Sequence, residues 1–94
     1  MPVRTTFDPS EALKVATRLG LDVAAEPFSL EEFRHGMEVE LEHGRRDPST
    51  NVTGDDPLTT GKIALAHLRE IPDYYTRLAR MEAEAEAAGA MDPA

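Results

Sequence analysis

The chain has 94 residues, of which 40% are hydrophobic and 30% charged, with a formal net charge of -8 and no cysteine. This size suits one domain with a small core, and the lack of cysteine excludes disulfides, thiolate metal sites and thiol nucleophiles. The negative charge disfavours nucleic acids and anionic membranes, whose phosphates it repels, and suits a cationic partner or a bound cation.

The first predicted helix covers residues 9–19. Asp8 is suited to the N-cap, Pro9 to the first helical position, and Glu11 to the return bond of a capping box. Gly20 is expected to end the helix. An apolar stripe at helical spacing is formed by Leu13, Val15, Ala16 and Leu19.

The second predicted helix covers residues 30–43. Ser29 is its expected N-cap, Glu32 completes a second capping box, and Phe28 is placed to pack against Phe33 as a hydrophobic staple. One face of this helix carries Phe33, Met37, Glu40 and Leu41. A carboxylate therefore falls on an otherwise apolar face.

Gly44 is expected to stop the second helix, and residues 45–56 are expected to form one long irregular loop, because Asp, Pro, Ser, Thr, Asn and Gly dominate them. A third helix follows over residues 56–70, with Pro57 at its first position. Its apolar set is Leu58, Ile63, Ala64, Leu65, Ala66, Leu68 and Ile71, and Gly61 either weakens it or allows close packing.

Pro72 breaks the helical register, and a fourth helix is predicted over residues 73–88 with an apolar side formed by Tyr74, Tyr75, Leu78, Met81 and Ala85. Residues 89–94 are expected to be a disordered tail. The sequence thus predicts a single all-α domain over residues 1–94, ordered over about 8–88. Its three to four short helices should form an orthogonal or bundle-like array with one long loop.

Two Glu/His pairs are the most specific chemical feature. Glu40 precedes His43 by three residues, and His67 precedes Glu70 by three, so each pair shares a helix face. If the second and third helices pack antiparallel, the mirrored pairs can meet. Two imidazoles and two carboxylates suit Zn, Mn or Fe, and the spacing is the one that di-iron helical bundles use.

A structural polar network is the competing interpretation of the same residues. A buried carboxylate is costly unless it is paired or ligated. Glu40 and His67 can satisfy each other, or pair with an arginine or a tyrosine, without any metal. Tyr74 and Tyr75 are expected to divide into one core ring and one surface ring.

The sequence also resembles a family of short bacterial and bacteriophage proteins that is catalogued only as a domain of unknown function. The likeness rests on residues 33–44, 50–53, 60–68 and 70–75, and it extends over roughly residues 12–84. The resemblance implies that the family signature includes Glu40, Glu42, His43, His67, Glu70, Tyr74 and Tyr75. It implies no activity, and it does not say whether these residues bind metal or support the fold.

Three hypotheses for function follow. The first is a small metal-binding helical protein that uses Glu40, His43, His67 and Glu70, in one chain or shared between two. The second is a protein-interaction or phage-accessory module without chemistry of its own, which uses the apolar side of the fourth helix and the 45–56 loop. The third is a small hydrolase or oxidoreductase built on the same site.

We further expect a cytoplasmic protein, because residues 1–8 hold no apolar run of a signal peptide and no stretch reaches the ~18 apolar residues of a membrane span. The expected partner is a second copy of the chain or another protein. Neither a nucleic acid nor a membrane is expected to bind.

Overall fold

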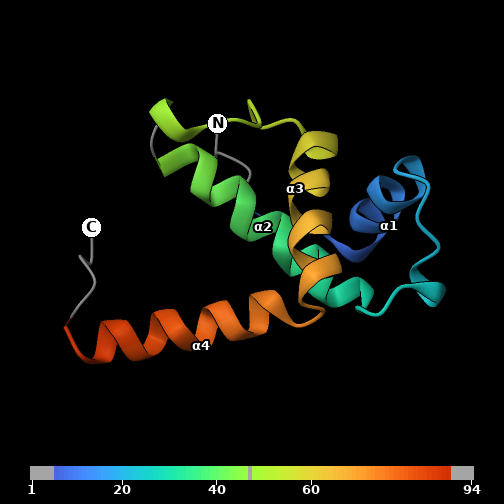
Figure 1. Cartoon of the computed structure of the whole chain (residues 1–94). Coiled ribbons are helices and arrows are strands. Elements are labelled where there is room, and N and C mark those ends of the chain that lie inside the picture. Colours follow the sequence, from blue (N-terminus) through green and yellow to red (C-terminus); the bar gives the residue numbers. More distant parts are fainter. Residues whose placement is uncertain (1–5, 47, 90–94) are drawn as a thin grey trace.

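The structure, a computed structural model, describes residues 6–46 and 48–89 and folds them as helices and connecting segments (Figure 1). The helices are α1 (Pro9–Arg18), α2 (Leu30–Arg46), α3 (Pro57–Glu70) and α4 (Tyr74–Ala87), with short 3-10 turns η1 (Val23–Ala25) and η2 (Pro48–Thr50) between them. The described residues contain no strand, so the all-α prediction is confirmed. The predicted tail lies, except for Gly89, outside the described residues.

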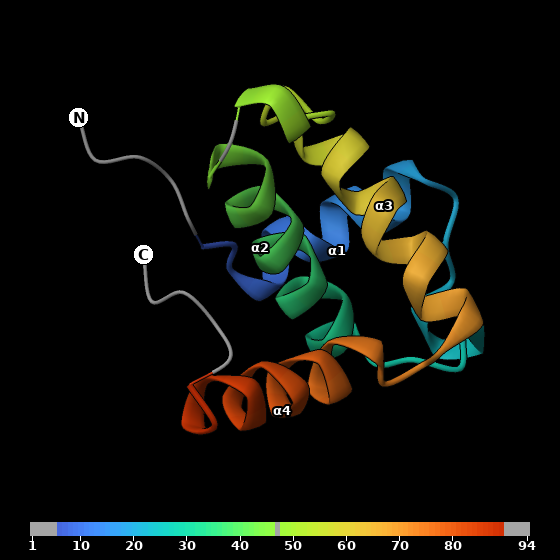
Figure 2. The same ribbon diagram turned by 60° about the vertical axis from the view of Figure 1, so that its left-hand side comes forward.

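Helix α2 is the centre of the fold, because it packs against α1, α3 and α4. Burial of apolar side chains along these contacts is the main force that holds the helices together. The core consists of Phe7, Ala12, Val15, Ala16, Phe28, Phe33, Met37, Leu41, Ala64, Leu68 and Tyr75. Helices α1, α2 and α3 form one group, whereas α4 runs away from it, so that its C-terminal half stands clear of α1 and α3 (Figures 1 and 2).

Two glycines allow the close helix contacts. A Cβ atom on Gly61 of α3 would lie 2.6 Å from Cγ1 of Val15 in α1, and one on Gly36 of α2 would lie 2.7 Å from Cδ2 of Tyr75 in α4. Real Cβ atoms do not approach other atoms so closely, so each contact depends on the missing side chain. Of the two roles that the sequence leaves open for Gly61, close packing is the one observed.

The predicted caps of α1 and α3 are confirmed. Asp8 accepts a hydrogen bond from the amide of Glu11, and the Glu11 carboxylate accepts one from the amide of Asp8. Asp56 accepts from the amide of Thr59 at 2.9 Å and from its hydroxyl at 2.8 Å. These bonds satisfy backbone donors that the helix itself leaves free.

The predicted end of the second helix is wrong. Gly44 does not stop α2, which continues to Arg46. Gly44 is buried, and a Cβ atom there would lie 3.0 Å from Oδ1 of Asn51. The glycine is therefore explained by the loop packed against it and not by a C-cap.

The segment between α2 and α3 is shorter than the predicted 45–56 loop. Helix α2 includes Arg45 and Arg46, and Pro48–Thr50 form η2. Asn51 Oδ1 accepts hydrogen bonds from the amide of Gly54 at 3.0 Å and from the hydroxyl of Thr53 at 3.2 Å. These local bonds fold the segment into a turn that delivers the chain to the N-cap of α3.

Two predicted core positions are also wrong. Leu13 is 49% exposed and Ile71 is 39% exposed, whereas Ala12 and Thr60 are fully buried. Thr60 tolerates burial because its hydroxyl donates to the backbone carbonyl of Asp56 at 2.7 Å. The buried faces of α1 and α3 are therefore rotated slightly from the apolar stripes that the sequence predicts.

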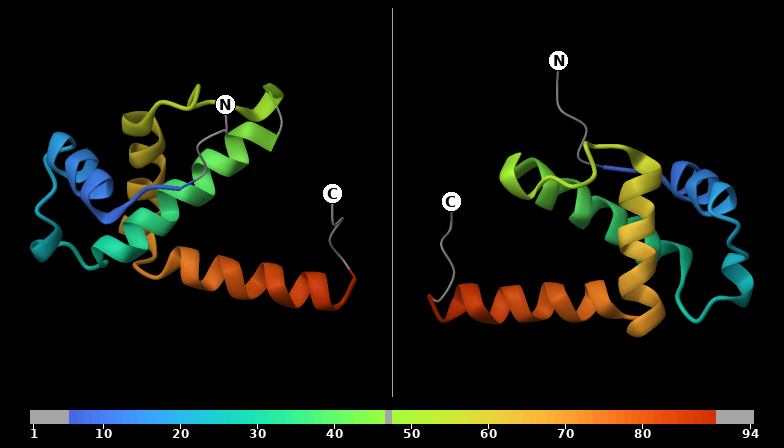
Figure 3. Two further views of the ribbon diagram at one scale, coloured as in Figure 1. Left: turned by 180° about the vertical axis from the view of Figure 1, so that it is seen from behind. Right: turned by 45° about the horizontal axis from the view of Figure 1, so that its top comes forward.

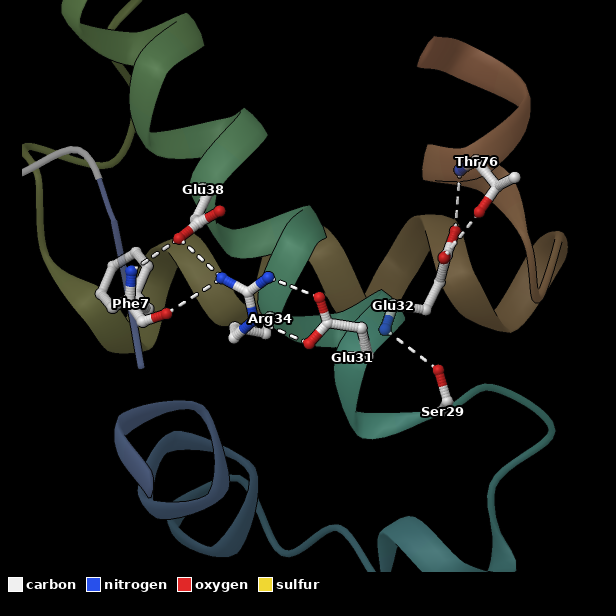
Figure 4. A network of polar contacts seen from close by, with 7 residues as sticks. All are labelled: Phe7, Ser29, Glu31, Glu32, Arg34, Glu38 and Thr76. Carbon is white, nitrogen blue, oxygen red and sulfur yellow. Dashed lines mark hydrogen bonds and ion pairs between the residues drawn. The ribbon is translucent and has the colours of Figure 1, made fainter. Parts of the chain in front are cut away.

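Polar contacts of α2 tie down two other segments (Figure 4). Arg34 Nη1 donates to the carbonyl of Phe7 at 3.1 Å and to Glu38 Oε2 at 2.8 Å, and the same carboxylate oxygen accepts from the amide of Phe7. Arg34 also binds Glu31 through Nε, at 2.8 Å. This network attaches the segment before α1 to the side of α2.

The capping box expected at the start of α2 is only half formed. The amide of Glu32 donates to Ser29 Oγ at 3.0 Å, as predicted. The Glu32 carboxylate, however, accepts from the amide of Thr76 at 2.9 Å and from its hydroxyl at 2.8 Å (Figure 4). Asp73 forms no side-chain cap on α4, so a residue of α2 supplies the cap for α4.

We predict that Glu32→Ala lowers the free energy of unfolding by about 0.5–2 kcal/mol, the usual cost of losing an N-cap. Chemical denaturation of purified protein measures this change. Glu70→Ala is the control, because this exposed carboxylate of α3 has no part in the contact between Glu32 and Thr76. Equal loss of stability in the two variants would contradict a cap that crosses from α2 to α4.

Candidate functional site

A pocket of about 500 Å³ is lined by residues of α2, α3 and α4. The ribbons of α2 and α4 diverge from their junction (Figure 3). Its lining combines apolar side chains with carboxylates: Val39, Glu40, Glu42, His43, Arg46, His67, Tyr74, Leu78, Met81 and Glu82. We call this set the α2/α4 groove. Three carboxylates face one guanidinium in it, so the groove carries an excess of two negative charges when both histidines are neutral.

Tyr75 forms the base of the junction between α2 and α4. Its side chain is fully buried, and its hydroxyl donates a hydrogen bond to Glu40 Oε2 at 2.8 Å. The ring lies against Gly36, one turn before Glu40 on α2. A single side chain of α4 thus makes both an apolar and a polar contact with α2.

Glu40 is satisfied by this contact. Its side chain is only 13% exposed, and the Nε2 atom of His67 lies 3.8 Å from the same oxygen that Tyr75 binds. A carboxylate removed from water requires such donors, because its desolvation is otherwise costly. Glu40 therefore has the tyrosine and histidine partners that the polar-network interpretation requires.

Tyr74 and His67 extend the cluster toward the open side of the groove. Their rings stack with centroids 4.4 Å apart and planes within 4°, and Tyr74 meets Tyr75 edge to face at 5.0 Å. Tyr75 is the core ring that the sequence predicts, but Tyr74 is half-buried against the core and is not the predicted surface ring. Aromatic contacts of this kind add to the energy of area burial and fix ring orientation.

Burial raises the pKa of the Tyr75 hydroxyl well above its usual value of 10.0, and the adjacent Glu40 carboxylate raises it further. Ionisation of Tyr75 would place a second negative charge beside Glu40 in a site with little water. Both effects favour the neutral hydroxyl, which is the form that donates to Glu40.

The structure brings together only some of the predicted metal ligands. Glu40 and His67 lie side by side, and the exposed His43 lines the same groove. Glu70 is exposed near the C-terminal end of α3 and is not part of the groove lining. Within residues 6–46 and 48–89, no group of three or more His, Asp or Glu side chains is arranged to hold a metal ion.

Val39 and Arg46 line the groove but are not among the site residues that the sequence predicts. They share a face of α2 with the predicted His43, at spacings of four and three residues. The predicted second helix ends before Arg46, so this face is incomplete in the sequence pattern. Glu82 belongs to an acidic run that is usually a solvated face, and nothing in its spacing distinguishes it from Glu84 or Glu86.

We predict that Tyr75→Phe lowers the free energy of unfolding by about 1–3 kcal/mol, because Glu40 loses its hydroxyl donor while remaining largely buried. Thermal or chemical unfolding measures the loss. The double variant Tyr75→Phe, Glu40→Leu should regain part of it, since the unsatisfied carboxylate is then absent. An unchanged free energy of unfolding in Tyr75→Phe, which keeps the ring, would argue that the ring and not the hydrogen bond supplies the stability.

The raised pKa of Tyr75 also predicts an alkaline loss of stability. Above pH 10 the unfolded chain ionises this tyrosine and binds fewer protons than the folded chain does, so the free energy of unfolding falls as the pH rises. Tyrosinate absorbance of the folded protein should accordingly show the same amplitude near pH 10 in the wild type and in Tyr75→Phe. A smaller amplitude in the variant would mean that Tyr75 ionises while folded.

No helix in the described part of the chain is long and apolar enough to cross a membrane.

A sequence model of a family described as "Protein of unknown function (DUF5661)" matches residues 12–84. This match covers most of α1, all of α2 and α3, most of α4 and every residue that lines the groove. Neither the curated proteins nor the solved structures gave a match to this chain.

Proposed function

The chain belongs to this family of proteins of unknown function, DUF5661, and we propose that it is a protein-interaction module whose α2/α4 groove docks a segment of a partner protein. The partner segment would carry apolar and basic side chains. The observation that supports this proposal is a large open groove that combines an apolar floor with an excess of negative charge. The hypothesis from the sequence places a partner on the apolar side of the fourth helix, and the present proposal extends that surface to the whole groove.

The apolar part of the groove is suited to side chains of a helix. Tyr74, Leu78, Met81 and Ala85 follow one another at spacings of four, three and four residues, which is the seam pattern of helices that pack in pairs. Met81 is 58% exposed, although it belongs to this seam. Exposed apolar surface rimmed by polar residues is typical of an interaction site.

The charged part of the groove favours a basic partner. Two carboxylates line the groove from different helices, Glu42 from α2 and Glu82 from α4. Glu42 is exposed and Glu82 is half-buried. The net charge of -8 adds a long-range field of the same sign. Such complementarity speeds encounter with a cationic segment and selects against acidic ones.

We predict that this groove binds a fluorescently labelled helical peptide with Leu side chains on one face and Lys side chains on the other. Fluorescence anisotropy at low ionic strength measures the binding. Glu82→Lys should weaken binding at least about tenfold, because it replaces an attraction with a repulsion. Glu70→Lys is the matched control, since it makes the same charge change outside the groove.

Equal weakening by Glu82→Lys and Glu70→Lys would reduce the binding to a general charge effect and contradict the groove. Binding of the same peptide with Glu in place of Lys would contradict the chosen partner chemistry.

Divalent-metal binding is the second candidate, and the proximity of Glu40 to His67, with His43 lining the same groove, is the observation that favours it. Zn, Mn or Fe would be held by a carboxylate oxygen and imidazole nitrogens, which are ordinary ligands for these ions. Side chains of the groove would have to move toward one another, because the described residues form no ready-made ligand group.

The metal candidate predicts that Zn²⁺ or Mn²⁺ raises the melting temperature of untagged protein, since a ligand that binds only the folded state stabilises it. His67→Gln and His43→Gln should abolish the rise, and Glu70→Gln should retain it if the ion sits in the groove. A rise that depends on Glu70 would restore the full set of Glu40, His43, His67 and Glu70. An unchanged melting temperature in the wild type would remove this candidate.

A further inference from the structure

We propose that the segment docked in the α2/α4 groove is helix α4 of a second copy of this chain, lying antiparallel to α4. This inference rests on the proposed function and names its partner. Three observations carry it: the seam on α4, the separation of charge along α4, and the placement of two opposite charges on the same flank of the seam.

The seam gives each copy an apolar face that residues 6–46 and 48–89 of its own chain leave partly uncovered. Tyr74 and Leu78 pack partly against the core, but Met81 is exposed and Ala85 is half-buried. Helix α4 contacts α2 near Tyr75 and then diverges from it (Figures 1 and 3). A second helix placed in the opening would cover the seam and also reach Val39 on α2.

Charge is divided between the two halves of α4. The N-terminal half carries Arg77 and Arg80, and the C-terminal half carries Glu82, Glu84 and Glu86. In an antiparallel pair, the basic half of each helix lies against the acidic half of the other. In a parallel pair in register, like charges would face each other, which is destabilising.

Arg77 and Glu84 make this complementarity specific. They are seven residues apart, so they lie on the same flank of the seam, and both are exposed. In antiparallel helix pairs this flank faces the equivalent flank of the partner, so Arg77 of each copy meets Glu84 of the other. One two-fold axis therefore forms the same ion pair twice, as a self-complementary interface requires.

The current partner of Arg77 does not prevent this contact. Its Nε atom binds Asp73 Oδ1 at 2.7 Å, within α4. A guanidinium has five N–H donors, so it can hold Asp73 and a second carboxylate together. Asp73 would then orient Arg77 toward the partner helix.

The same segment also satisfies the partner chemistry of the groove. The N-terminal half of α4 combines apolar side chains, such as Leu78, with the basic Arg77 and Arg80. This is the composition that an apolar groove bordered by Glu42 and Glu82 selects. The chain therefore carries both the groove and a segment that fits it.

Sedimentation equilibrium of the full chain over a series of concentrations tests the proposal. We expect a concentration-dependent shift from the 10.3 kDa monomer to twice that mass. Met81→Lys should raise the dimer dissociation constant by at least about tenfold, because it puts a charge in the seam. Ala83→Lys makes the same addition at an exposed position on the opposite face of α4 and should leave association unchanged.

Charge reversal gives the decisive comparison. Arg77→Glu and Glu84→Arg should each weaken association at least about tenfold, since each creates two like-charge contacts. The double variant should restore it, because both pairs re-form with opposite polarity. Circular dichroism checks that each variant is folded, and only folded variants are compared.

A single species of 10.3 kDa at every concentration would overturn the second copy as the occupant. Dimers that survive Met81→Lys, or single reversals that the double variant does not rescue, would overturn the antiparallel α4 interface. Peptide binding that persists in a monomeric protein would overturn only this inference and leave the docking groove in place. Loss of both would remove the proposed function as well.

Discussion

The arrangement of the molecule depends on how one tyrosine joins α4 to α2. Tyr75 places its ring against Gly36, where any larger residue would collide with it, and its hydroxyl on Glu40. The first contact sets how closely the helices approach, and the second fixes where along α2 the approach occurs. The cap that Glu32 provides to Thr76 adds a second point of attachment near the start of α4.

This mode of attachment explains why a groove exists. Helix α4 is anchored near its N-terminal end, at Tyr75 and Thr76, and the rest of the helix has no comparable anchor on α2. The two helices therefore diverge, and apolar side chains such as Leu78 and Met81 line the space between them together with residues of α2. A core this small cannot cover every apolar face, so the uncovered one becomes available to a partner.

The buried carboxylate has a structural role that is compatible with a functional one. Glu40 receives the Tyr75 hydroxyl and lies near His67, whose ring is held by stacking on Tyr74. The cluster orders the closed end of the groove and places a negative charge there. It thereby links the packing of the fold to the charge that the groove presents.

Local rules were sufficient for the helices that begin with a recognisable cap. Asp8 with Glu11, and Asp56 with Pro57, fix helix starts through contacts within a few residues. The same rules failed at Gly44 and at Glu32. At both positions a partner outside the helix decides what the residue does: Asn51 of the following segment packs against Gly44, and Thr76 of α4 binds Glu32.

The candidate site was likewise predictable only in part. The position of Glu40 on an apolar face correctly indicated a carboxylate that needs a partner, and tyrosine was among the partners considered. The mirrored spacing of the two Glu/His pairs, Glu40/His43 and His67/Glu70, does not show whether the pairs meet. Their meeting depends on how α2 and α3 are rotated about their axes. The structure leaves Glu70 outside the groove, and the groove itself arises from the divergence of α2 and α4, which no local pattern encodes.

The most direct test of this account is the nuclear Overhauser effect between the Tyr75 ring protons and the α-protons of Gly36 in the folded protein. We predict strong effects between these groups, because the ring lies directly against the glycine. Their absence, with the Tyr75 ring instead close to protons of another helix, would place α4 elsewhere and contradict the α2/α4 junction on which the groove and its proposed partner depend.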